Sequence, residues 1–287
     1  MPMADTVAGA EHIIFGFRII IGESMSTPKK SLGQHWLHDE ATLNYICDVA
    51  DISSDDTILE IGPGTGTLTA KLLDNGAKVV AVEKDKALAK NLPINVRGAT
   101  SHISQKLEVV QEDILQFDLG QLPTGYKVVA NIPYYLTSNL LRVLSESANP
   151  PATAVLLVQK EVAQRIAAGP GQMSLLAVSI QLYYRPELGQ VVPAKLFEPP
   201  PKVDSQVIIL RRRQKPLFKD LDNQKFFRLV KAGFSQRRKK LRSSLAGGLG
   251  ISKDQAEALL RSAGIAADAR AQELSLEDWH QLSKATF

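Results

Sequence analysis

The fold is decided by one stretch of the sequence, TILEIGPGTGTL at residues 57–68, in which a short apolar run meets three closely spaced glycines. The run at 57–61 is rich in β-branched residues, as expected of a strand buried on both faces. The glycines at 62, 64 and 66 allow a sharp turn and a close approach of the backbone to a ligand. The stretch therefore predicts the first strand, turn and helix of a parallel sheet.

The same alternation of short apolar runs and longer amphipathic stretches continues to about Leu157. Further strands are predicted at 78–82, 107–110, 126–130 and 154–158, and helices at 68–75, 86–92 and 138–147. This alternation is typical of a doubly wound sheet with crossover helices. We therefore predict a Rossmann-like α/β sheet as the main domain, at residues 31–213.

The character of the chain changes after Pro193. Three successive prolines at 199–201 exclude a helix there, and residues 204–211 fit an added antiparallel strand. Two helices are predicted beyond it, at 226–245 and 252–263, separated by the glycines at 247, 248 and 250. We predict a small all-helical domain at 214–287, and a flexible N-terminal extension at 1–30.

Composition narrows the class of protein. The chain has 287 residues, 44% of them hydrophobic, with 34 Lys and Arg against 30 Asp and Glu, so that a polyanionic partner is mildly favoured. Its single cysteine, Cys47, excludes an intrachain disulfide and a cysteine-cluster metal site. We therefore expect a cytoplasmic protein without a bound metal.

The apolar run at residues 13–21 is interrupted by Arg18 and is shorter than the about 20 residues that a membrane span requires. No basic segment precedes it, so it is interpreted as neither a signal nor an anchor, and no membrane is expected as a partner. Met25 precedes a polar segment, and one hypothesis is that translation starts there.

The glycine turn indicates which nucleotide-like ligand it accepts. The third glycine of a dinucleotide fingerprint is missing, because Thr67 or Thr69 stands in its place, and no Gly-Lys-Ser/Thr follows that would hold a triphosphate. The spacing E-x-G-x-G-x-G fits the S-adenosylmethionine loop of Rossmann-like methyltransferases, with Gly62 and Gly64 near the ligand. An ordinary tight turn is the alternative.

Two acidic positions support that ligand. Glu83 ends the second strand, where a carboxylate can accept protons from both hydroxyls of a ribose. Asp113 and Ile114 follow the third strand, where the carboxylate would bind an adenine amino group and the isoleucine would pack on the ring. A solvated strand end is the alternative for Glu83, and a helix cap for Asp113.

The most specific signal is Asn131-Ile132-Pro133-Tyr134 at the end of the fourth strand. The N6 of adenine is a poor nucleophile because its lone pair is delocalised. The Asn131 oxygen and the carbonyl of Ile132 or Pro133 would accept both amino protons and aim the lone pair at a methyl sulfonium, while Tyr134 stacks on the extruded base. A strand that simply ends in an Asn-x-Pro turn is the alternative.

With these residues the chain resembles the ribosomal RNA adenine N6,N6-dimethyltransferase family, from Ser31 almost to its end. The segment SLGQHWL at 31–37 is similar to the family's L-G-Q-N-F-L, which closes over the cofactor, although His35 and Trp36 replace its asparagine and phenylalanine. The resemblance implies a class I methyltransferase sheet that converts S-adenosylmethionine to S-adenosylhomocysteine without a metal. The cofactor contacts that it implies are His35, Leu37, Gly62, Glu83, Asp113 and Asn131.

Two further segments, LVQKEVAQR at 157–165 and FEPPPKVDS at 197–205, also resemble family motifs. Phe197 is a candidate for the second face of a base sandwich, and a hydrophobic plug beneath the triproline turn is the equal alternative. The resemblance implies dimethylation of two adjacent adenines near the 3′ end of small-subunit ribosomal RNA, free or in a pre-ribosomal particle, by a monomer.

A helix expected at 228–242 carries seven basic residues and no acidic one. Phosphate contact through Arg237, Arg238 and Lys239 is favoured over a merely solvated face, and the arginines at 211–213 would extend the patch. Two rivals remain: the large-subunit methyltransferase of the macrolide-resistance type, which shares the Asn131–Tyr134 motif, and a non-catalytic ribosome-assembly or transcription factor on the same scaffold.

Overall fold

A computed structural model of the chain describes residues 33–97, 106–236 and 238–287. The expectations about residues 1–30, a start at Met25 and Arg237 lie outside these residues.

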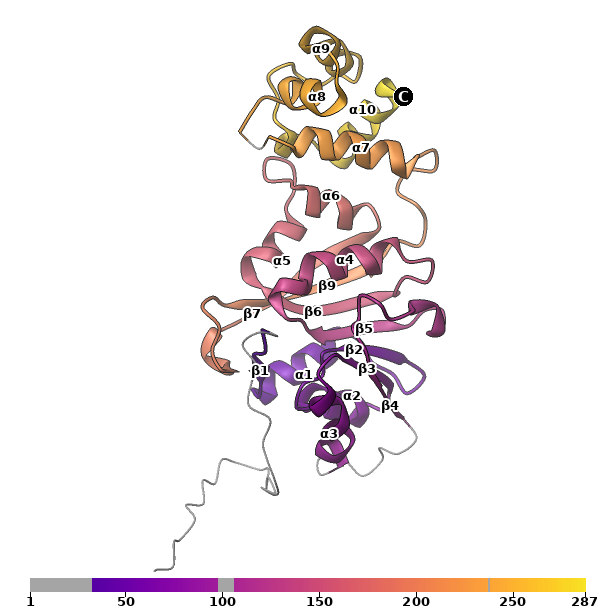
Figure 1. Ribbon diagram of the computed structural model, residues 1–287, viewed down its shortest axis with the longest axis vertical. Coiled ribbons are helices and arrows are strands. Elements are labelled where there is room, and N and C mark those ends of the chain that lie inside the picture. Colours follow the sequence, from indigo (N-terminus) through magenta and orange to yellow (C-terminus); the bar gives the residue numbers. More distant parts are fainter. Residues whose placement is uncertain (1–32, 98–105, 237) are drawn as a thin grey trace, which may run out of the picture.

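The centre of the molecule is a seven-stranded sheet with the order β4-β3-β2-β5-β6-β9-β7 (Figure 1). Its strands are β2 (Thr57–Ile61), β3 (Lys78–Glu83), β4 (Leu107–Gln111), β5 (Lys127–Asn131), β6 (Thr153–Gln159), β7 (Tyr184–Val192) and β9 (Ser205–Arg212). The first five strands of the order are parallel, whereas β9 and β7 are antiparallel to their neighbours. The strand order reverses at β2, so the carboxyl ends of β2 and β5 form the crevice where such sheets bind ligands.

The predicted strands and the added antiparallel strand are confirmed with ends that differ by at most two residues. Strand β7 was not predicted, because this edge strand carries Pro186 and Gly189 and its register shifts between Leu188 and Val191. A proline is tolerated at an edge because one side of the strand needs no donors.

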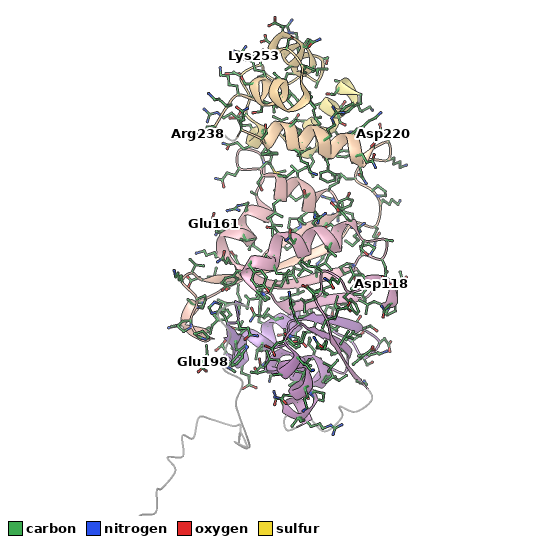
Figure 2. All side chains as sticks on the ribbon, in the orientation of Figure 1. Asp118, Glu161, Glu198, Asp220, Arg238 and Lys253 are labelled. Carbon is green, nitrogen blue, oxygen red and sulfur yellow. The ribbon has the colours of Figure 1, made fainter. Side chains whose placement is uncertain are left out.

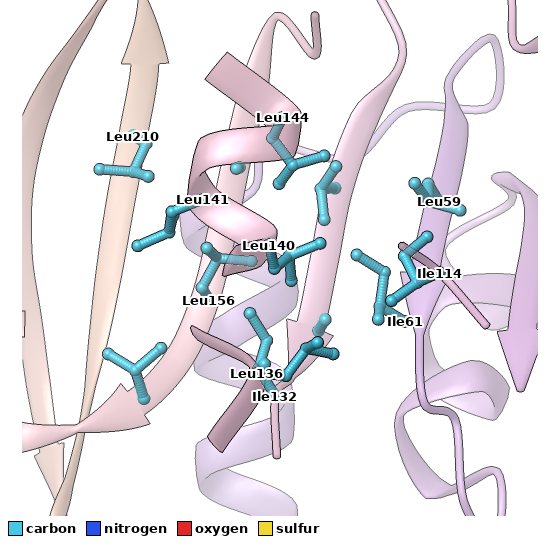
Figure 3. Close-up of a cluster of buried hydrophobic side chains, with 14 of the residues drawn as sticks. Leu59, Ile61, Ile114, Ile132, Leu136, Leu140, Leu141, Leu144, Leu156 and Leu210 are labelled. Carbon is cyan, nitrogen blue, oxygen red and sulfur yellow. The ribbon is translucent and has the colours of Figure 1, made fainter. Parts of the chain in front are cut away.

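Helices cover both faces of the sheet. On one face lie α1 (Glu40–Val49), α2 (Thr67–Asp74) and α3 (Lys86–Arg97), and on the other α4 (Thr137–Glu146), α5 (Lys160–Ala167) and α6 (Leu175–Gln181). Figure 3 shows Leu140, Leu141 and Leu144 of α4 among the buried side chains of the second face. Pro93 does not end α3 as the predicted boundary at 92 implied, because Leu92 and Val96 on either side of it are buried.

Four further helices gather at one end of the molecule, beyond α6 (Figure 1). They are α7 (Asn223–Phe234), α8 (Leu241–Leu249), α9 (Lys253–Ser262) and α10 (Leu276–Thr286). Their core surrounds the fully buried Trp279 and includes Ala177 and Val178 of α6, so the helical domain rests on the main domain through apolar contacts. Short 3-10 turns are η2 (Leu119–Gln121), η3 (Tyr134–Leu136), η4 (Ala194–Leu196) and η5 (Ala271–Glu273), and β1 (Trp36–Leu37) pairs with β8 (Phe197–Glu198). Among the helices so described, none is both long and apolar enough to cross a membrane.

The prediction of one continuous helix at 226–245, carrying the basic run at 228–242, is wrong. Helix α7 ends at Phe234 and α8 begins at Leu241. Consecutive cations at 237–240 repel one another, and the amide of Leu241 donates to the carbonyl of Ala269 at 2.8 Å. The turn folds Leu241 and Leu245 back into the core, which a straight helix would carry away from it.

The glycines at 247 and 248 lie inside α8 rather than between helices. Replacing each of them with alanine is expected to have opposite effects on the stability of the protein. A Cβ on Gly247 would meet only Gln236 Nε2, at an ordinary contact distance of 3.7 Å, so Gly247→Ala is expected to stabilise the protein by about 0.5–1 kcal/mol through helix propensity. A Cβ on Gly248 would lie 2.7 Å from the Cα of Ala232, so Gly248→Ala should force α7 and α8 apart and destabilise by about 1–3 kcal/mol. Urea denaturation of both variants checks this, and a stabilising Gly248→Ala would contradict it.

Candidate active site

One cavity opens at the carboxyl ends of β2, β3, β4 and β5, beneath the segment that contains β1. Its walls bring together ten of the residues singled out in the sequence: His35, Leu37, Gly62, Gly64, Glu83, Asp113, Ile114, Asn131, Pro133 and Tyr134. Trp36 and Glu60 line the same cavity. Side chains from five separate segments therefore converge where the strand order reverses.

The glycine turn and Glu83 form one rigid unit. The backbone amide of Gly64 donates to Glu83 Oε2 at 3.2 Å, and the amide of Asp85 donates to Oε1 at 2.8 Å. Burial raises the pKa of Glu83, and these backbone donors oppose the rise because they stabilise the carboxylate. Each oxygen keeps lone pairs for a ligand hydroxyl at the strand tip.

Asp113 caps a turn, as the alternative interpretation expected, and it also lines the cavity. Its Oδ1 accepts the amide of Leu115 at 3.0 Å and so caps the turn after β4. Its Oδ2 pairs with Lys84 Nζ at 2.8 Å, and that hydrogen bond lowers the pKa of the Asp113 carboxyl. Ile114 beside it is buried and lines the cavity. The carboxylate is thus held ionised at the rim of the cavity.

Asn131 is fixed by the segment that closes over it. Its Nδ2 donates to the carbonyl of His35 at 2.9 Å, across 96 residues of sequence. Since a carbonyl only accepts, the side-chain atom that faces it must be the nitrogen. The oxygen Oδ1 is therefore left to accept a hydrogen bond from a substrate amino group. The Pro133 carbonyl already accepts the amide of Leu136 at 2.9 Å, which favours Ile132 for the second acceptor.

Tyr134 is held by both its hydroxyl and its ring. The hydroxyl lies 2.8 Å from Ser205 Oγ, and burial raises the pKa of the phenol. The ring stacks with the imidazole of His35 at 5.7 Å between centroids and 24° between planes. His35 in turn donates through Nδ1 to the carbonyl of Pro199 at 2.6 Å. The aromatic face is therefore oriented before any base arrives.

The sequence profile of the family described as Ribosomal RNA adenine dimethylase matches residues 25–286. The chain belongs to this family. It is 42% identical over 258 residues to Ribosomal RNA small subunit methyltransferase A of Dehalococcoides mccartyi, with 88% of this chain and 87% of that protein covered. The protein of the same name from Alkaliphilus metalliredigens is 39% identical over 264 residues, with 89% and 90% covered.

Solved structures agree on the fold of this chain. The crystal structure of the 23S rRNA methyltransferase ErmE matches with a TM-score of 0.69 and 30% identity, covering 87% of this chain and 98% of that one. A dimethyladenosine transferase from Plasmodium falciparum matches with a TM-score of 0.71 and 26% identity, covering 86% and 96%. The predicted fold, a class I methyltransferase sheet with a helical C-terminal part, is thereby confirmed.

The structure does not place Phe197 on the cavity wall, as a base sandwich would require. The ring is 4% exposed, pairs with Leu37 across β1 and β8, and belongs to the apolar core. Phe197 is therefore the hydrophobic plug that the sequence offered as the alternative. It supplies the apolar side chain on which the short β1–β8 sheet packs. Contact of Phe197 with a base would require β1 to move away.

The described basic residues expected to contact phosphates lie apart from the cavity. Arg238 and Lys239 are exposed in the turn between α7 and α8, in the C-terminal domain (Figure 2). Of the arginines expected to extend this patch, Arg211 pairs with Glu187, and the guanidinium of Arg212 lies 5.1 Å from the ring centres of both Tyr183 and Tyr184. The guanidinium of Arg212 therefore interacts with side chains of the protein itself.

Lys84 and Ser205 were not assigned from the sequence. Lys84 follows Glu83 directly and Ser205 stood inside a quoted motif, but only the fold shows that they contact Asp113 and Tyr134. Trp36, a possible contact by the resemblance, and Glu60, the first residue of E-x-G-x-G-x-G, both line the cavity. In the part of the chain that the structure describes, no three His, Cys, Asp or Glu side chains gather as metal ligands would.

Proposed function

We propose that this chain transfers methyl groups from S-adenosylmethionine to the N6 atoms of two adjacent adenines near the 3′ end of small-subunit ribosomal RNA during ribosome biogenesis. The observation that carries the proposal is the Asn131 amide, whose nitrogen is bonded to His35 so that its oxygen is free beside Tyr134. The names of the relatives that cover 88–89% of the chain support the choice of small-subunit RNA.

The cavity fits S-adenosylmethionine in its donors and acceptors. The turn has positive φ angles at Gly62, Gly64 and Gly66, which lets backbone amides reach the ligand without side chains in the way. Glu83 would hold the ribose hydroxyls, and Asp113 with Ile114 the adenine. His35 and Leu37 would cover the ligand from β1 and its approach. When bound, the cofactor supplies an electrophilic methyl group on a sulfonium.

The protein's own part in the reaction is to position an amino group and hold its protons. Asn131 Oδ1 and the Ile132 carbonyl would accept the two N6 protons, which favours a pyramidal nitrogen with its lone pair exposed. Tyr134 would contribute about 1–3 kcal/mol by stacking on the base. The nitrogen loses a proton only after it becomes cationic, so no strong general base is required. Repetition with the remaining proton gives the dimethylated product.

Affinity for the RNA would come largely from phosphate contacts outside the cavity. Exposed Arg238 and Lys239 in the α7–α8 turn, with Arg228 and Lys231 on α7, form a basic surface on the helical domain. Such contacts set register and orientation rather than base identity. The partner is the small-subunit RNA or a pre-ribosomal particle, bound by one copy of the chain.

Transfer of tritiated methyl groups to undermethylated small and large ribosomal subunits tests the proposal. We expect label in small-subunit RNA, recovered as N6,N6-dimethyladenosine when the nucleosides are resolved. Label confined to large-subunit RNA would favour the ErmE-like function, to which the 30% identity with that enzyme points. Binding to particles without any transfer would favour an assembly factor.

A further inference from the structure

Tyr135 is a large aromatic residue that stays exposed at the mouth of the cavity. It lies in the turn η3 between Tyr134, which is half-buried, and Leu136, which is buried. Figure 3 shows Leu136 and Ile132 together among the buried side chains. Tyr135 is 60% exposed and nevertheless lines the cavity. The turn therefore presents one aromatic ring within the cavity and the next ring at its opening.

The ring of Tyr135 is supported along one edge by the backbone of Gly33. A Cβ on Gly33 would lie 3.3 Å from Cδ1 and 3.5 Å from Cε1 of the ring, so the ring rests where a side chain would otherwise stand. The φ angle of Gly33 is +60°, which residues with a side chain rarely adopt. A ring that is already supported loses little further conformational freedom when a second ring stacks on it.

A cation lies at the same rim of the cavity. Lys84 lines the cavity, and its side chain is 58% exposed. The pKa of Lys84 is raised chiefly by its hydrogen bond with Asp113, and Tyr135 adds to the rise, so the phenol lies near the ammonium. The ammonium has three donors, and those that do not bind Asp113 can approach a phosphate oxygen. An exposed aromatic ring beside an exposed cation is a combination with which proteins hold single-stranded nucleic acid.

The two adjacent adenines of the proposed substrate must react in turn, because the chain carries the Asn131–Tyr134 motif once. A single phosphodiester ties the target nucleotide to its neighbour, so the neighbouring base must lie at the mouth of the cavity. Tyr135 follows Tyr134 directly in the chain and is exposed at that mouth.

We propose that Tyr135 is the stacking platform for the base next to the target adenine, so that the second adenine is held on this ring while the first one reacts. The inference rests on the proposed function, because it takes ribosomal RNA with paired adenines as the substrate. It adds a recognition residue outside the reacting centre, and it explains why the turn η3 places two aromatic rings in succession at the cavity.

Steady-state methyl transfer to undermethylated small ribosomal subunits tests this role with three variants. Tyr135→Ala removes the platform and should raise KM about tenfold, with kcat changed less than about twofold because Asn131 and Tyr134 are untouched. Tyr135→Phe keeps the ring and should restore the KM of the wild type. Tyr135→Leu fills the space against Gly33 without an aromatic face, and its KM should be as high as that of the alanine variant. Ile94→Ala, which removes a 67% exposed side chain of α3 away from the cavity, is the matched control.

Small subunits in which one or the other adenine of the pair is replaced by uracil provide a second readout. Uracil stacks less strongly than adenine, so the rise in KM caused by Tyr135→Ala should shrink to about threefold on at least one of these subunits. An equal rise on all three RNAs would assign Tyr135 to the RNA backbone and overturn the inference. A wild-type KM for Tyr135→Leu would overturn it too, because packing against Gly33 would then be the whole role of the ring.

Calorimetric titration with S-adenosylhomocysteine separates this role from an effect on the cofactor. The affinity of each Tyr135 variant should lie within about twofold of wild type, which also shows that the cavity is still folded. A loss of affinity that parallels the rise in KM would overturn the inference. A wild type that transfers no methyl group to any of these subunits would instead refute the proposed function.

Discussion

Asn131→Ala is expected to lower the rate of methyl transfer to adenine roughly 100- to 1,000-fold, the loss typical when one preorganised polar group is removed from a reacting centre. The Asn131 side-chain nitrogen donates a hydrogen bond to the His35 carbonyl at 2.9 Å, and this contact fixes the orientation of the side-chain oxygen. The oxygen therefore needs no reorganisation when the base arrives. Single-turnover transfer to undermethylated small subunits measures the effect. Asn223→Ala, at the exposed start of α7, is the matched control and should behave as wild type.

The Asn131→Asp variant tests whether the orientation of the side-chain oxygen matters, because an aspartate keeps an oxygen acceptor but loses the amide donor. An aspartate would place two acceptors face to face where Nδ2 now donates to His35, so its carboxylate should turn away from that carbonyl. We expect transfer at pH 8 to be as slow as in Asn131→Ala. The aspartate variant should gain on the alanine variant as the pH falls to 6, because a protonated acid can donate to the carbonyl. Near wild-type transfer by the aspartate variant at pH 8 would show that the amide donor is not needed.

Glu83→Ala is expected to raise the dissociation constant of S-adenosylhomocysteine at least about 100-fold. The carboxylate would lose two hydrogen bonds to the ribose, each worth about 1.5–3 kcal/mol when one partner is charged. It would also release the amides of Gly64 and Asp85, which loosens the glycine turn. Calorimetric titration measures the change, with Glu108→Ala on the neighbouring strand as the control.

The pH dependence of the wild type supplies a further check on Glu83. Burial raises the pKa of this carboxyl, so the acceptor is lost by protonation at a higher pH than for an exposed glutamate. Affinity should therefore fall as the pH is lowered, and this fall should be absent in Glu83→Ala. An affinity of the alanine variant within threefold of wild type would contradict the ribose role.

The sequence predicted the parallel part of the sheet well because each strand and crossover helix has a local signal. Unbroken apolar runs, glycine turns and leucine spacing all lie within about ten residues, and β2 to β6 follow them. Because these strands are parallel, their carboxyl ends lie at the same edge of the sheet. Glu83, Asp113 and Asn131 therefore line one cavity, as expected. Edge strand β7 and the break between α7 and α8 lacked such a local signal and were missed.

The sequence by itself determined the sheet, the motif Asn131–Tyr134 and the identity of the residues that could meet a nucleoside. Only the tertiary structure decided what those residues do: the His35 carbonyl turns the Asn131 amide, Ser205 holds Tyr134, and Phe197 is a plug beneath β1. The physical reason is distance along the chain. Asn131 and His35 are 96 positions apart, Tyr134 and Ser205 are 71 apart, and Phe197 pairs with Leu37 across 160 positions. Their approach depends on the packing of the whole sheet and leaves no periodic signal in the sequence.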